Sequence, residues 1–205
     1  LGILGSGGFG LVALVKVQGK VLAMKALSKK QVVAAGIEKH VMEERNIGMM
    51  LDHPFLVCLK GTFQDPKFLY MFQQPVLGGE LYAYLERHNN DTSSTMRGIS
   101  EPEAKFYAGC VLYGLEYLHN RSYCYRDLKP ENCLIDEQGY VKITDFGFVK
   151  KVVDRTYTMC GTIDYMAPEI LMRKGHNKEV DIWAFGVLIF EMTTHGTPFE
   201  YCQDD

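Results

Sequence analysis

The sequence CYRDLKPENCLI, Cys124 to Ile135, places a charged run between two apolar flanks. Burying Arg126, Asp127, Lys129 and Glu131 beside such flanks costs free energy unless each charge has a partner or a task. The run is therefore either an ion-pair turn between two structural elements or a loop that performs chemistry. The rest of the chain has to distinguish these two interpretations.

The overall composition is that of an ordinary soluble globular protein. The 205 residues are 47% hydrophobic and 23% charged, enough for one large domain or two lobes around a cleft. The net charge is −3 and no basic tail is present, so nucleic acid is not an expected partner. The longest apolar run, Ile182 to Phe190, is far too short for a membrane span, and the first residues do not resemble a signal peptide.

The cysteines are scattered along the chain. No two of them form a C-x-x-C pair, so a zinc site is not expected. Scattered cysteines in a chain of this size are typical of small buried hydrophobic residues in a reducing compartment, and we expect a cytoplasmic protein. They are Cys58, Cys110, Cys124, Cys133, Cys160 and Cys202.

Two parts with different secondary structure are predicted. The first part contains short β-branched and aromatic runs typical of strands, with one helix between them. After Gly79 the periodicity becomes helical, and Ser100 with Glu103 fits a capping box. The sequence predicts an α+β protein with a small antiparallel-sheet lobe, residues 1–76, and a larger mainly helical lobe, residues 77–205. Expected strands are 11–17, 21–27, 57–63 and 68–72, expected helices include 37–50 and 180–191, a hairpin covers 133–144, and 74–79 and 89–98 form a connection and a surface loop.

The segment LGSGGFGLV, which begins at Leu4, is a first candidate binding site. Gly5, Gly7 and Gly10 give the pattern G-x-G-x-x-G between predicted strands, and glycine lets backbone amides approach phosphate oxygens. Taken alone, the pattern fits a tight hairpin better. No helix follows it and no G-K-[ST] is present, so neither a dinucleotide-binding Rossmann unit nor a P-loop is expected.

A lysine follows this loop on the next predicted strand, as Lys25 of AMK. A strand lysine usually faces solvent, but one behind a glycine hairpin can reach into the covered cleft and meet a phosphate. It would then need a carboxylate partner, and the helical run HVMEERNI supplies Glu43 and Glu44. Each glutamate could otherwise be an ordinary solvent-facing residue.

Two acidic motifs in the second half change this balance. Asp127 of RDLKPEN and Asp145 of DFG are 18 residues apart, with Asn132 between them and a predicted hairpin joining them. Such a hairpin can bring two carboxylates and an amide together, and these oxygen ligands suit Mg²⁺ with its waters and substrate phosphates. APE, residues 167–169, and DIWAFG, residues 181–186, follow. Each motif alone has a structural explanation, but six motifs in one order do not share one.

Together the motifs resemble the catalytic domain of eukaryotic protein kinases over nearly the whole chain. YRDLKPEN has a tyrosine where most kinases have histidine, and the details resemble the AGC group. DFGFVKK and TYTMCGTIDYMAPEI are similar to the cyclic-nucleotide-dependent kinases, and LGGELY is most similar to their cGMP-dependent branch. The resemblance implies a bilobal kinase fold, with ATP and Mg²⁺ as cofactors.

The resemblance also implies roles for the residues of the catalytic loop. Asp127 would accept or orient the proton of the substrate hydroxyl, and Lys129 would neutralise the transferred γ-phosphoryl group. Asn132 and Asp145 would hold two Mg²⁺ ions. Lys129, two residues past the base, and Thr162 in CGT resemble the class that phosphorylates serine and threonine.

The small lobe would hold most of the nucleotide. Lys25 would bind its α- and β-phosphates and pair with Glu44, which the H-x-x-x-E spacing from His40 favours over the neighbouring glutamate. Adenine would lie between apolar side chains of both lobes, with backbone bonds to Gln74 and Val76. The residues implied in nucleotide binding are Leu4, Gly5, Ser6, Gly7, Gly8, Phe9, Gly10, Val12, Ala23, Lys25, Gln74, Val76, Leu134 and Thr144.

Protein substrates are the implied partners. Glu80, Glu131 and Glu191 match family positions that bind basic residues upstream of the acceptor, although each could equally be an acidic surface residue. A cyclic-nucleotide-binding regulatory domain outside this chain is a further partner that the resemblance suggests.

Thr158, in TYTMCGT, lies where this group of kinases is phosphorylated. A phosphate there would add a charge of about −1.5 to −2 and three acceptor oxygens. By resemblance, Arg126, Lys150 and His40 would bind it, which would order the loop and set the position of Glu44.

The chain departs from the family pattern at Gly48. The family has a bulky residue there, which completes a stack through Phe146 and Tyr125. Glycine leaves a gap and costs about 1 kcal/mol of helix propensity relative to alanine, unless Met49 or Met50 fills the space.

Other departures concern the pocket and the length of the chain. Gln73 is an unusual polar residue at the back of the nucleotide pocket. By comparison with the family, the last helices of the larger lobe and the tail that wraps the smaller lobe are missing, so we expect the isolated chain to be unstable or weakly active.

Two other functions compete with a protein kinase. A pseudokinase scaffold would hold nucleotide or partners without catalysis, but all the groups that phosphoryl transfer needs are present. A small-molecule phosphotransferase is disfavoured because APE and CGT belong to peptide-substrate loops.

Overall fold

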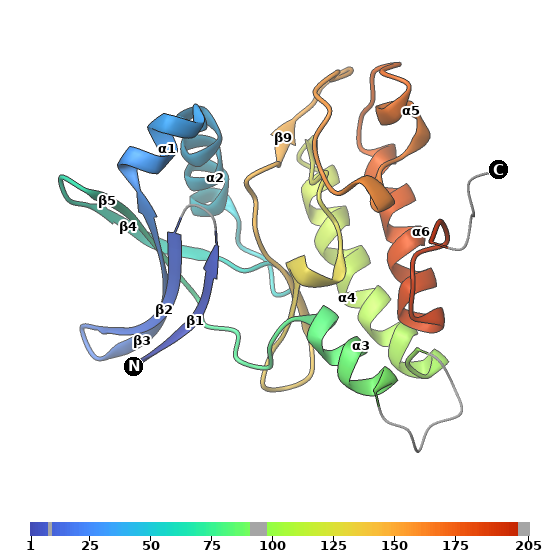
Figure 1. Cartoon of the computed structure of the whole chain (residues 1–205), viewed down its shortest axis with the longest axis horizontal. Coiled ribbons are helices and arrows are strands. Elements are labelled where there is room, and N and C mark those ends of the chain that lie inside the picture. The colour runs from blue at the N-terminus through green and yellow to red at the C-terminus, as the bar shows by residue number, and fades with distance from the viewer. Residues whose placement is uncertain (8–9, 91–97, 201–205) are drawn as a thin grey trace.

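A computed structural model of the chain describes residues 1–7, 10–90 and 98–200, which form two lobes (Figure 1). The smaller lobe is built on a five-stranded antiparallel sheet with the order β1-β2-β3-β5-β4. Two helices pack beside it and bury a separate apolar cluster of Leu27, Val32, Val41, Leu59 and Met71. The elements are β1 (Gly2–Gly7), β2 (Gly10–Val17), β3 (Lys20–Ser28), α1 (Lys29–Ala35), α2 (Glu38–Met50), β4 (Leu59–Gln64) and β5 (Phe68–Gln73).

Helix α1 was not expected from the sequence. It has only seven residues and one buried side chain, Val32, so it shows no helical periodicity. Local chemistry fixes its ends instead: the Ser28 hydroxyl accepts a hydrogen bond from the Gln31 amide, and Gly36 ends the helix in the left-handed conformation.

The expected strand 57–63 begins later than predicted, at Leu59. The Val57 amide donates to the Ile143 carbonyl at 2.8 Å, and the Ile143 amide donates to the Phe55 carbonyl at 2.9 Å. Residues 55–57 therefore pair with the larger lobe. This pairing attaches the end of the α2–β4 connection to the hairpin that follows the catalytic loop.

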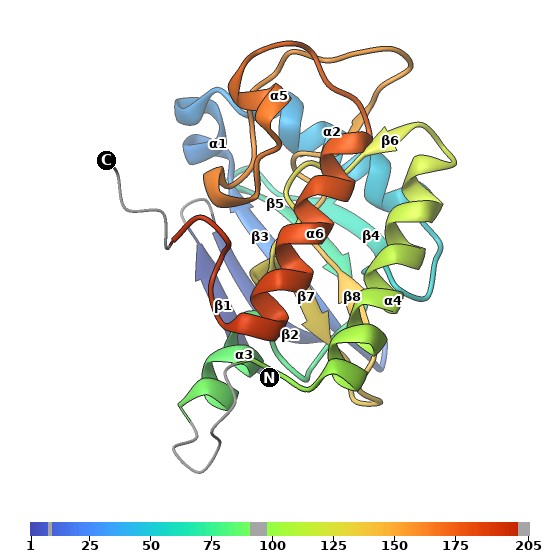
Figure 2. The same cartoon turned by 90° about the vertical axis from the view of Figure 1, so that its right-hand side faces the viewer.

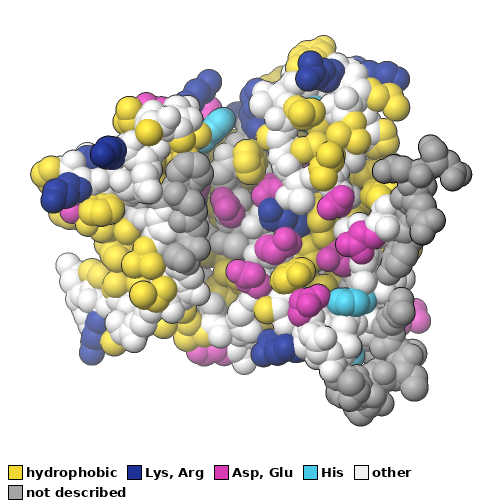
Figure 3. All heavy atoms as spheres, in the orientation of Figure 1, with side chains coloured by type: hydrophobic (Ala, Val, Ile, Leu, Met, Phe, Trp, Pro, Cys, Tyr) yellow, Lys and Arg dark blue, Asp and Glu magenta, His cyan; other side chains and the backbone are white. Residues whose placement is uncertain are grey.

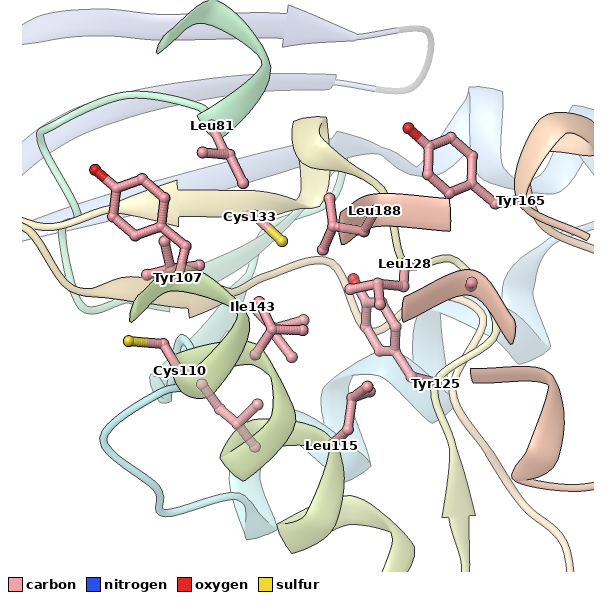
Figure 4. Close-up of a cluster of buried hydrophobic side chains, with 14 of the residues drawn as sticks. Leu81, Tyr107, Cys110, Leu115, Tyr125, Leu128, Cys133, Ile143, Tyr165 and Leu188 are labelled. Carbon is pink, nitrogen blue, oxygen red and sulfur yellow. The ribbon is translucent and has the colours of Figure 1, made fainter. Parts of the chain in front are cut away.

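The larger lobe is mainly helical. Its core joins α4 and α6, which lie side by side, to the hairpin β7–β8 (Figures 2 and 4). Tyr125 and Leu128 enter this core between the helices and are almost completely buried. The elements are α3 (Leu81–Asn89), α4 (Glu101–His119), β6 (Tyr123–Cys124), η1 (Pro130–Asn132), β7 (Cys133–Ile135), β8 (Val141–Ile143), β9 (Lys150–Lys151), η2 (Ile163–Tyr165), α5 (Pro168–Leu171) and α6 (Glu179–Thr194).

Several expectations for this lobe are met in altered form. The hairpin forms within 133–144, and Gly139 turns it with a φ of 87°. Ser100 caps α4, but its hydroxyl donates to the Glu103 carboxylate at 2.9 Å and bonds no helix amide. Most of the expected surface loop 89–98 lies outside the described residues.

Helix α6 is apolar on most of its sides, but one of its faces is open to solvent. Val180, Leu188 and other residues of one face belong to the core. Ile182 and Phe190, on the opposite face, are 51% and 38% exposed. Among the described residues no helix is long and apolar enough to span a membrane.

Candidate functional site

Strand β3 and helix α2 are joined by one charged contact. Lys25 Nζ lies 2.7 Å from Glu44 Oε1, and both side chains are mostly buried. Burial lowers the pKa of Lys25, but Glu44 and Asp145 outweigh it, so the net pKa is raised and the ammonium form is retained. The spacing argument for Glu44 agrees with this contact, since Glu43 lies 3.9 Å from the exposed Lys39 instead.

The Asp127 carboxylate is buried and held by three side chains. It accepts from Asn132 Nδ2 at 2.8 Å and from the Thr162 hydroxyl at 3.2 Å. Lys129 Nζ lies 3.7 Å away and also donates to Thr162 Oγ1 at 2.9 Å. Burial raises the pKa of Asp127, and Asp145 adds to the rise, while the three contacts oppose it. A fixed carboxylate with a raised pKa can accept a proton from a hydroxyl group placed beside it.

Asn132 connects Asp127 to the second acidic residue. Its side-chain Nδ2 also donates to the backbone carbonyl of Asp127 at 2.8 Å. The backbone carbonyl of Asn132 accepts from the Thr144 amide at 2.9 Å. Asp145 follows with a φ of 56°, and its carboxylate lies 4.0 Å from Lys25 Nζ. Asn132 and Asp145 therefore lie on one cleft, and the Asp127 carboxylate is bonded to Asn132 directly beside them.

The donor set at this point suits Mg²⁺ that is bound together with a phosphate. The Asn132 amide nitrogen is directed to Asp127, which leaves the amide oxygen for another ligand, and the Asp145 carboxylate is half exposed. Within the described ranges no group of three His, Cys, Asp or Glu side chains could hold a metal ion. Mg²⁺ commonly binds through one or two protein oxygens, with waters and substrate phosphates completing its shell.

A cleft of about 600 Å³ runs between the lobes beside these groups, and Figure 3 shows acidic side chains gathered on the larger lobe next to it. The Gln74 amide donates to the Cys58 carbonyl at 3.2 Å, so only the carbonyl of Gln74 remains for a ligand. Gln73 lines the cleft as its position suggested. The lining includes nine of the residues expected to bind nucleotide: Leu4, Gly5, Val12, Ala23, Lys25, Gln74, Val76, Leu134 and Thr144.

The glycines of the segment that begins at Leu4 occupy positions with different steric requirements. A Cβ at Gly10 would lie 2.0 Å from the Ala26 carbonyl oxygen, so close packing of β2 on β3 requires glycine there. Gly5 borders the cleft and has open space around it, and Gly7 pairs with Gly10 across the hairpin. Gly8, Phe9 and the side chain of Ser6 lie outside what the structure describes.

The main chain at Tyr125 and Arg126 is held by Asp181 of α6, a residue for which no role was predicted. Its fully buried carboxylate accepts from the Tyr125 amide at 2.8 Å and the Arg126 amide at 2.7 Å. His119 Nε2 lies 2.7 Å from the same carboxylate. The motif DIWAFG contains this residue, but its partners are 55 and 56 residues away in sequence, so spacing alone could not identify them.

Tyr125 does more than fill an apolar position. Its ring is fully buried against Phe146, as expected, but its hydroxyl donates to the Thr144 carbonyl. The tyrosine that replaces histidine therefore also ties the YRD motif to the residue before DFG.

The gap expected at Gly48 is not present. Met49 and Met50 are 49% and 59% exposed and do not fill it. Leu59 of β4 takes the space, since a Cβ at position 48 would lie only 3.2 Å from Leu59 Cβ. The Lys25–Glu44 contact forms in the presence of this glycine.

The acidic residues expected to read the substrate lie at different depths. Glu80 is exposed, Glu131 is partly buried in η1, and both line the cleft. Glu191 of α6 accepts a hydrogen bond from the buried Tyr165 hydroxyl, a contact absent from the sequence-based prediction. Burial raises the pKa of Glu191 to about 7, and neighbouring carboxylates add to the rise.

Thr158 is exposed, and the basic residues expected to meet its phosphate contact other groups. Lys150 Nζ donates to the buried Thr156 hydroxyl at 2.9 Å. Arg126 Nε donates to the Phe148 carbonyl at 2.9 Å, and His40 is exposed on α2. The structure therefore does not bring these three side chains together at Thr158.

Comparison with known proteins finds kinases among the similar proteins, in agreement with the geometry of the site. The chain is 48% identical over 198 residues to a cAMP-dependent protein kinase catalytic subunit of Arthrobotrys oligospora, which covers 96% of this chain and 37% of that protein. It is 45% identical to the human cAMP-dependent protein kinase catalytic subunit PRKX, over 97% of this chain and 54% of that protein. It is also 45% identical to the cGMP-dependent protein kinase egl-4 of Caenorhabditis briggsae, over 98% of this chain and 26% of that protein.

The chain thus spans well under two thirds of each of these three relatives. Their similar identities do not separate a cGMP-dependent from a cAMP-dependent type, so the preference drawn from LGGELY is not supported. The family model described as protein kinase domain matches residues 1–205. With its bilobal fold and its paired motifs around one cleft, the chain belongs to the protein kinase domain family.

Proposed function

We propose that this chain catalyses the transfer of the γ-phosphoryl group of ATP to serine or threonine hydroxyls of proteins. The single observation that carries the proposal is that Asn132, which bonds the Asp127 carboxylate, lines the same cleft as the Lys25–Glu44 pair and Asp145. Protein kinases use ATP and Mg²⁺, and when bound the ion neutralises charge on the phosphates.

The chain's own residues supply positioning and charge. Lys25, fixed by Glu44, provides a cation at the small-lobe wall of the cleft. Asn132 and Asp145 are the residues that would hold Mg²⁺, and the amide oxygen of Asn132 and the half-exposed carboxylate of Asp145 fit that task. Phosphoryl transfer asks mainly for such preorganised charge, because the protein makes no covalent bond in the step.

At the other wall, Asp127 orients the acceptor hydroxyl and takes its proton. Its raised pKa brings it closer to the basicity that this task needs. Lys129 is held between Asp127 and Thr162, where its ammonium group balances the negative charge of the transferred group. Thr162 bonds both, so the base, the cation and the start of the peptide-binding segment share one small network.

The finer features of the function rest on the resemblance. Glu80, Glu131 and Glu191 would bind basic side chains upstream of the acceptor, which the acidic surface of the larger lobe supports (Figure 3). Phosphate on Thr158 would draw Lys150 and Arg126 away from their present contacts. A cyclic-nucleotide-binding regulatory domain outside this chain stays a proposal, supported by the similarity to kinases named as cAMP-dependent and cGMP-dependent. The described cysteines are free thiols, four of them buried, which supports a reducing, cytoplasmic setting.

The test is transfer of radiolabelled γ-phosphate from ATP to an arginine-rich serine peptide by the full-length protein. We expect Asp127→Asn to lower kcat by about 10²- to 10⁴-fold and to leave ATP binding in place. A wild-type protein that binds ATP but transfers no phosphate to any peptide in a serine/threonine library would support a scaffold function instead.

A further inference from the structure

The dipeptide His176-Asn177, just before α6, contacts the segment that leads to Thr158. Thr156 and His176 exchange two backbone hydrogen bonds, of 2.8 and 2.9 Å. The Thr156 hydroxyl in turn accepts from Lys150 Nζ at 2.9 Å. Thr156 is therefore fixed on both sides, and it is only 4% exposed.

The Asn177 side chain reaches further, to the strand that enters the catalytic loop. Its Nδ2 donates to the Asp154 carbonyl at 2.7 Å, and its Oδ1 accepts from the Cys124 thiol at 3.4 Å and the Lys178 amide at 2.8 Å. Cys124 is fully buried, and burial raises the pKa of its thiol to about 12, so the thiol keeps the hydrogen that it donates. Asp127 follows Cys124 by three residues in the sequence.

These contacts close a ring. Cys124 of β6 pairs with Lys150 of β9 in the two-stranded sheet, Lys150 bonds Thr156, Thr156 pairs with His176, and Asn177 returns to Cys124. Asn177 is the one member whose side chain joins the segment 150–158 to β6 directly. The motifs that define the proposed function do not include it.

We propose that Asn177 is a positioning residue for phosphoryl transfer, because its amide ties the segment 150–158 to β6 and so keeps Asp127 in register with the segment that carries Thr162. The inference rests on the proposed function. Asn177 does not line the nucleotide cleft, so its loss should act on the chemical step and spare ATP binding.

The experiment measures kcat and the KM for ATP in the full-length protein, with the phosphorylation of Thr158 determined for each variant. We expect Asn177→Ala to lower kcat by about 10-fold, with the KM for ATP unchanged within about twofold. Cys124→Ala should lower kcat by about threefold, and Cys124→Ser, which keeps a donor, should restore it. Asp154→Ala is the matched control, because Asn177 bonds the carbonyl of that residue and the side chain is exposed.

A double-mutant cycle separates positioning from simple loss of stability. If Asn177 acts through Cys124, the double variant should be no slower than Asn177→Ala alone, whereas multiplied losses would overturn the proposal. A lower melting temperature with wild-type kcat would overturn it as well.

Amide hydrogen exchange keeps the inference testable if the wild-type protein transfers no phosphate, in which case the proposed function fails. The Thr156 and His176 amides should then exchange faster in Asn177→Ala than in wild type and in Asp154→Ala. Equal exchange in all three proteins would show that Asn177 does not hold the segment, and would overturn the inference independently of activity.

Discussion

Lys25 Nζ on strand β3 lies 2.7 Å from Glu44 Oε1 on helix α2, although the two residues are 19 positions apart in the sequence. Removing either partner leaves a mostly buried charge without its counterion. We expect Lys25→Met and Glu44→Gln each to lower kcat/KM for peptide phosphorylation by about 100-fold. Glu43→Gln is the matched control, because that glutamate precedes Glu44 in α2 and, within the described ranges, pairs with the exposed Lys39 alone. Equal losses in Glu43→Gln and Glu44→Gln would contradict the assignment.

Recognition of basic substrates should depend on pH through Glu191. Burial raises its pKa to about 7, so the carboxyl group is largely neutral below that pH and charged above it. The KM for an arginine-containing peptide should therefore fall by about fivefold between about pH 6 and pH 8. Glu191→Gln should have a higher KM without this dependence. A wild-type KM that stays flat across the range would remove Glu191 from substrate binding.

The same ionisation affects the stability of the fold. A rise in pH should improve peptide binding but should lower this stability. Because the folded state raises the pKa of Glu191, this group stabilises the fold below its ordinary pKa and loses that contribution as the pH rises through about 7. Chemical denaturation of wild type and Glu191→Gln across this range measures the effect: the two proteins should be similarly stable at low pH, where both side chains are neutral, and wild type should become the less stable one as the pH rises through about 7.

Gly48 should tolerate little added volume. Its closest neighbour is Leu59, 3.2 Å from the place of a Cβ, so a leucine at position 48 would overpack the contact between α2 and β4. We expect Gly48→Leu to reduce the free energy of unfolding by about 1–3 kcal/mol and to lower kcat through displacement of Glu44. Adding Leu59→Ala should recover part of both losses. If Gly48→Leu proves more stable than wild type, the interpretation that Leu59 already fills this space is wrong.

Phosphate on Thr158 should raise activity. Thr158 is exposed, Lys150 Nζ donates to Thr156, and Arg126 donates from Nε to a backbone carbonyl while its Nη1 has no partner among the described residues. We expect Thr158→Ala to lower kcat by about 10-fold, since the phosphate would supply strong acceptors for these cations. Tyr157→Phe, which removes the neighbouring exposed hydroxyl, is the control. Full activity in Thr158→Ala, with no phosphate on the wild-type residue by mass spectrometry, would contradict this role.

The open face of α6 should make the isolated chain of 205 residues associate with itself. Ile182 and Phe190 expose apolar area on a helix whose other face belongs to the core of the lobe. We expect the chain to form oligomers by light scattering, and Ile182→Lys with Phe190→Lys to reduce them. Val153→Lys, a substitution at an 86% exposed apolar residue away from α6, should not.

Motif order and local periodicity were enough to predict the fold class. Strand alternation, turn residues and helical spacing depend on neighbours within a few positions, so β2, β3, β5, α2 and the β7–β8 hairpin could be placed closely. Helix α1 has too few residues for a period to show. The shift of Val57 from the sheet to the larger lobe depends on Ile143, which no local pattern reveals.

For the site, the sequence indicated which residues share the cleft but not all of their partners. The catalytic loop contains Asp127, Lys129 and Asn132 within six positions, so their proximity follows from the backbone itself. The roles of Asp181 and Tyr165 were not predicted, because their partners lie far away in the sequence. Asp181 accepts from the Tyr125 amide, 56 residues away, and Tyr165 donates to the Glu191 carboxylate, 26 residues away. Such long-range pairings are products of helix packing, and spacing does not encode them.

The hold of Asp181 on the amides of Tyr125 and Arg126 has a consequence for synthesis of the protein. When residues 123–145 have been synthesised, Asp181, whose carboxylate fixes the amides of Tyr125 and Arg126, has not yet been translated. Until α6 docks, nascent chains carry every motif of the catalytic loop and yet lack its shape. Phosphate transfer should therefore begin late during translation. Stalled chains that end before position 181 should transfer no phosphate.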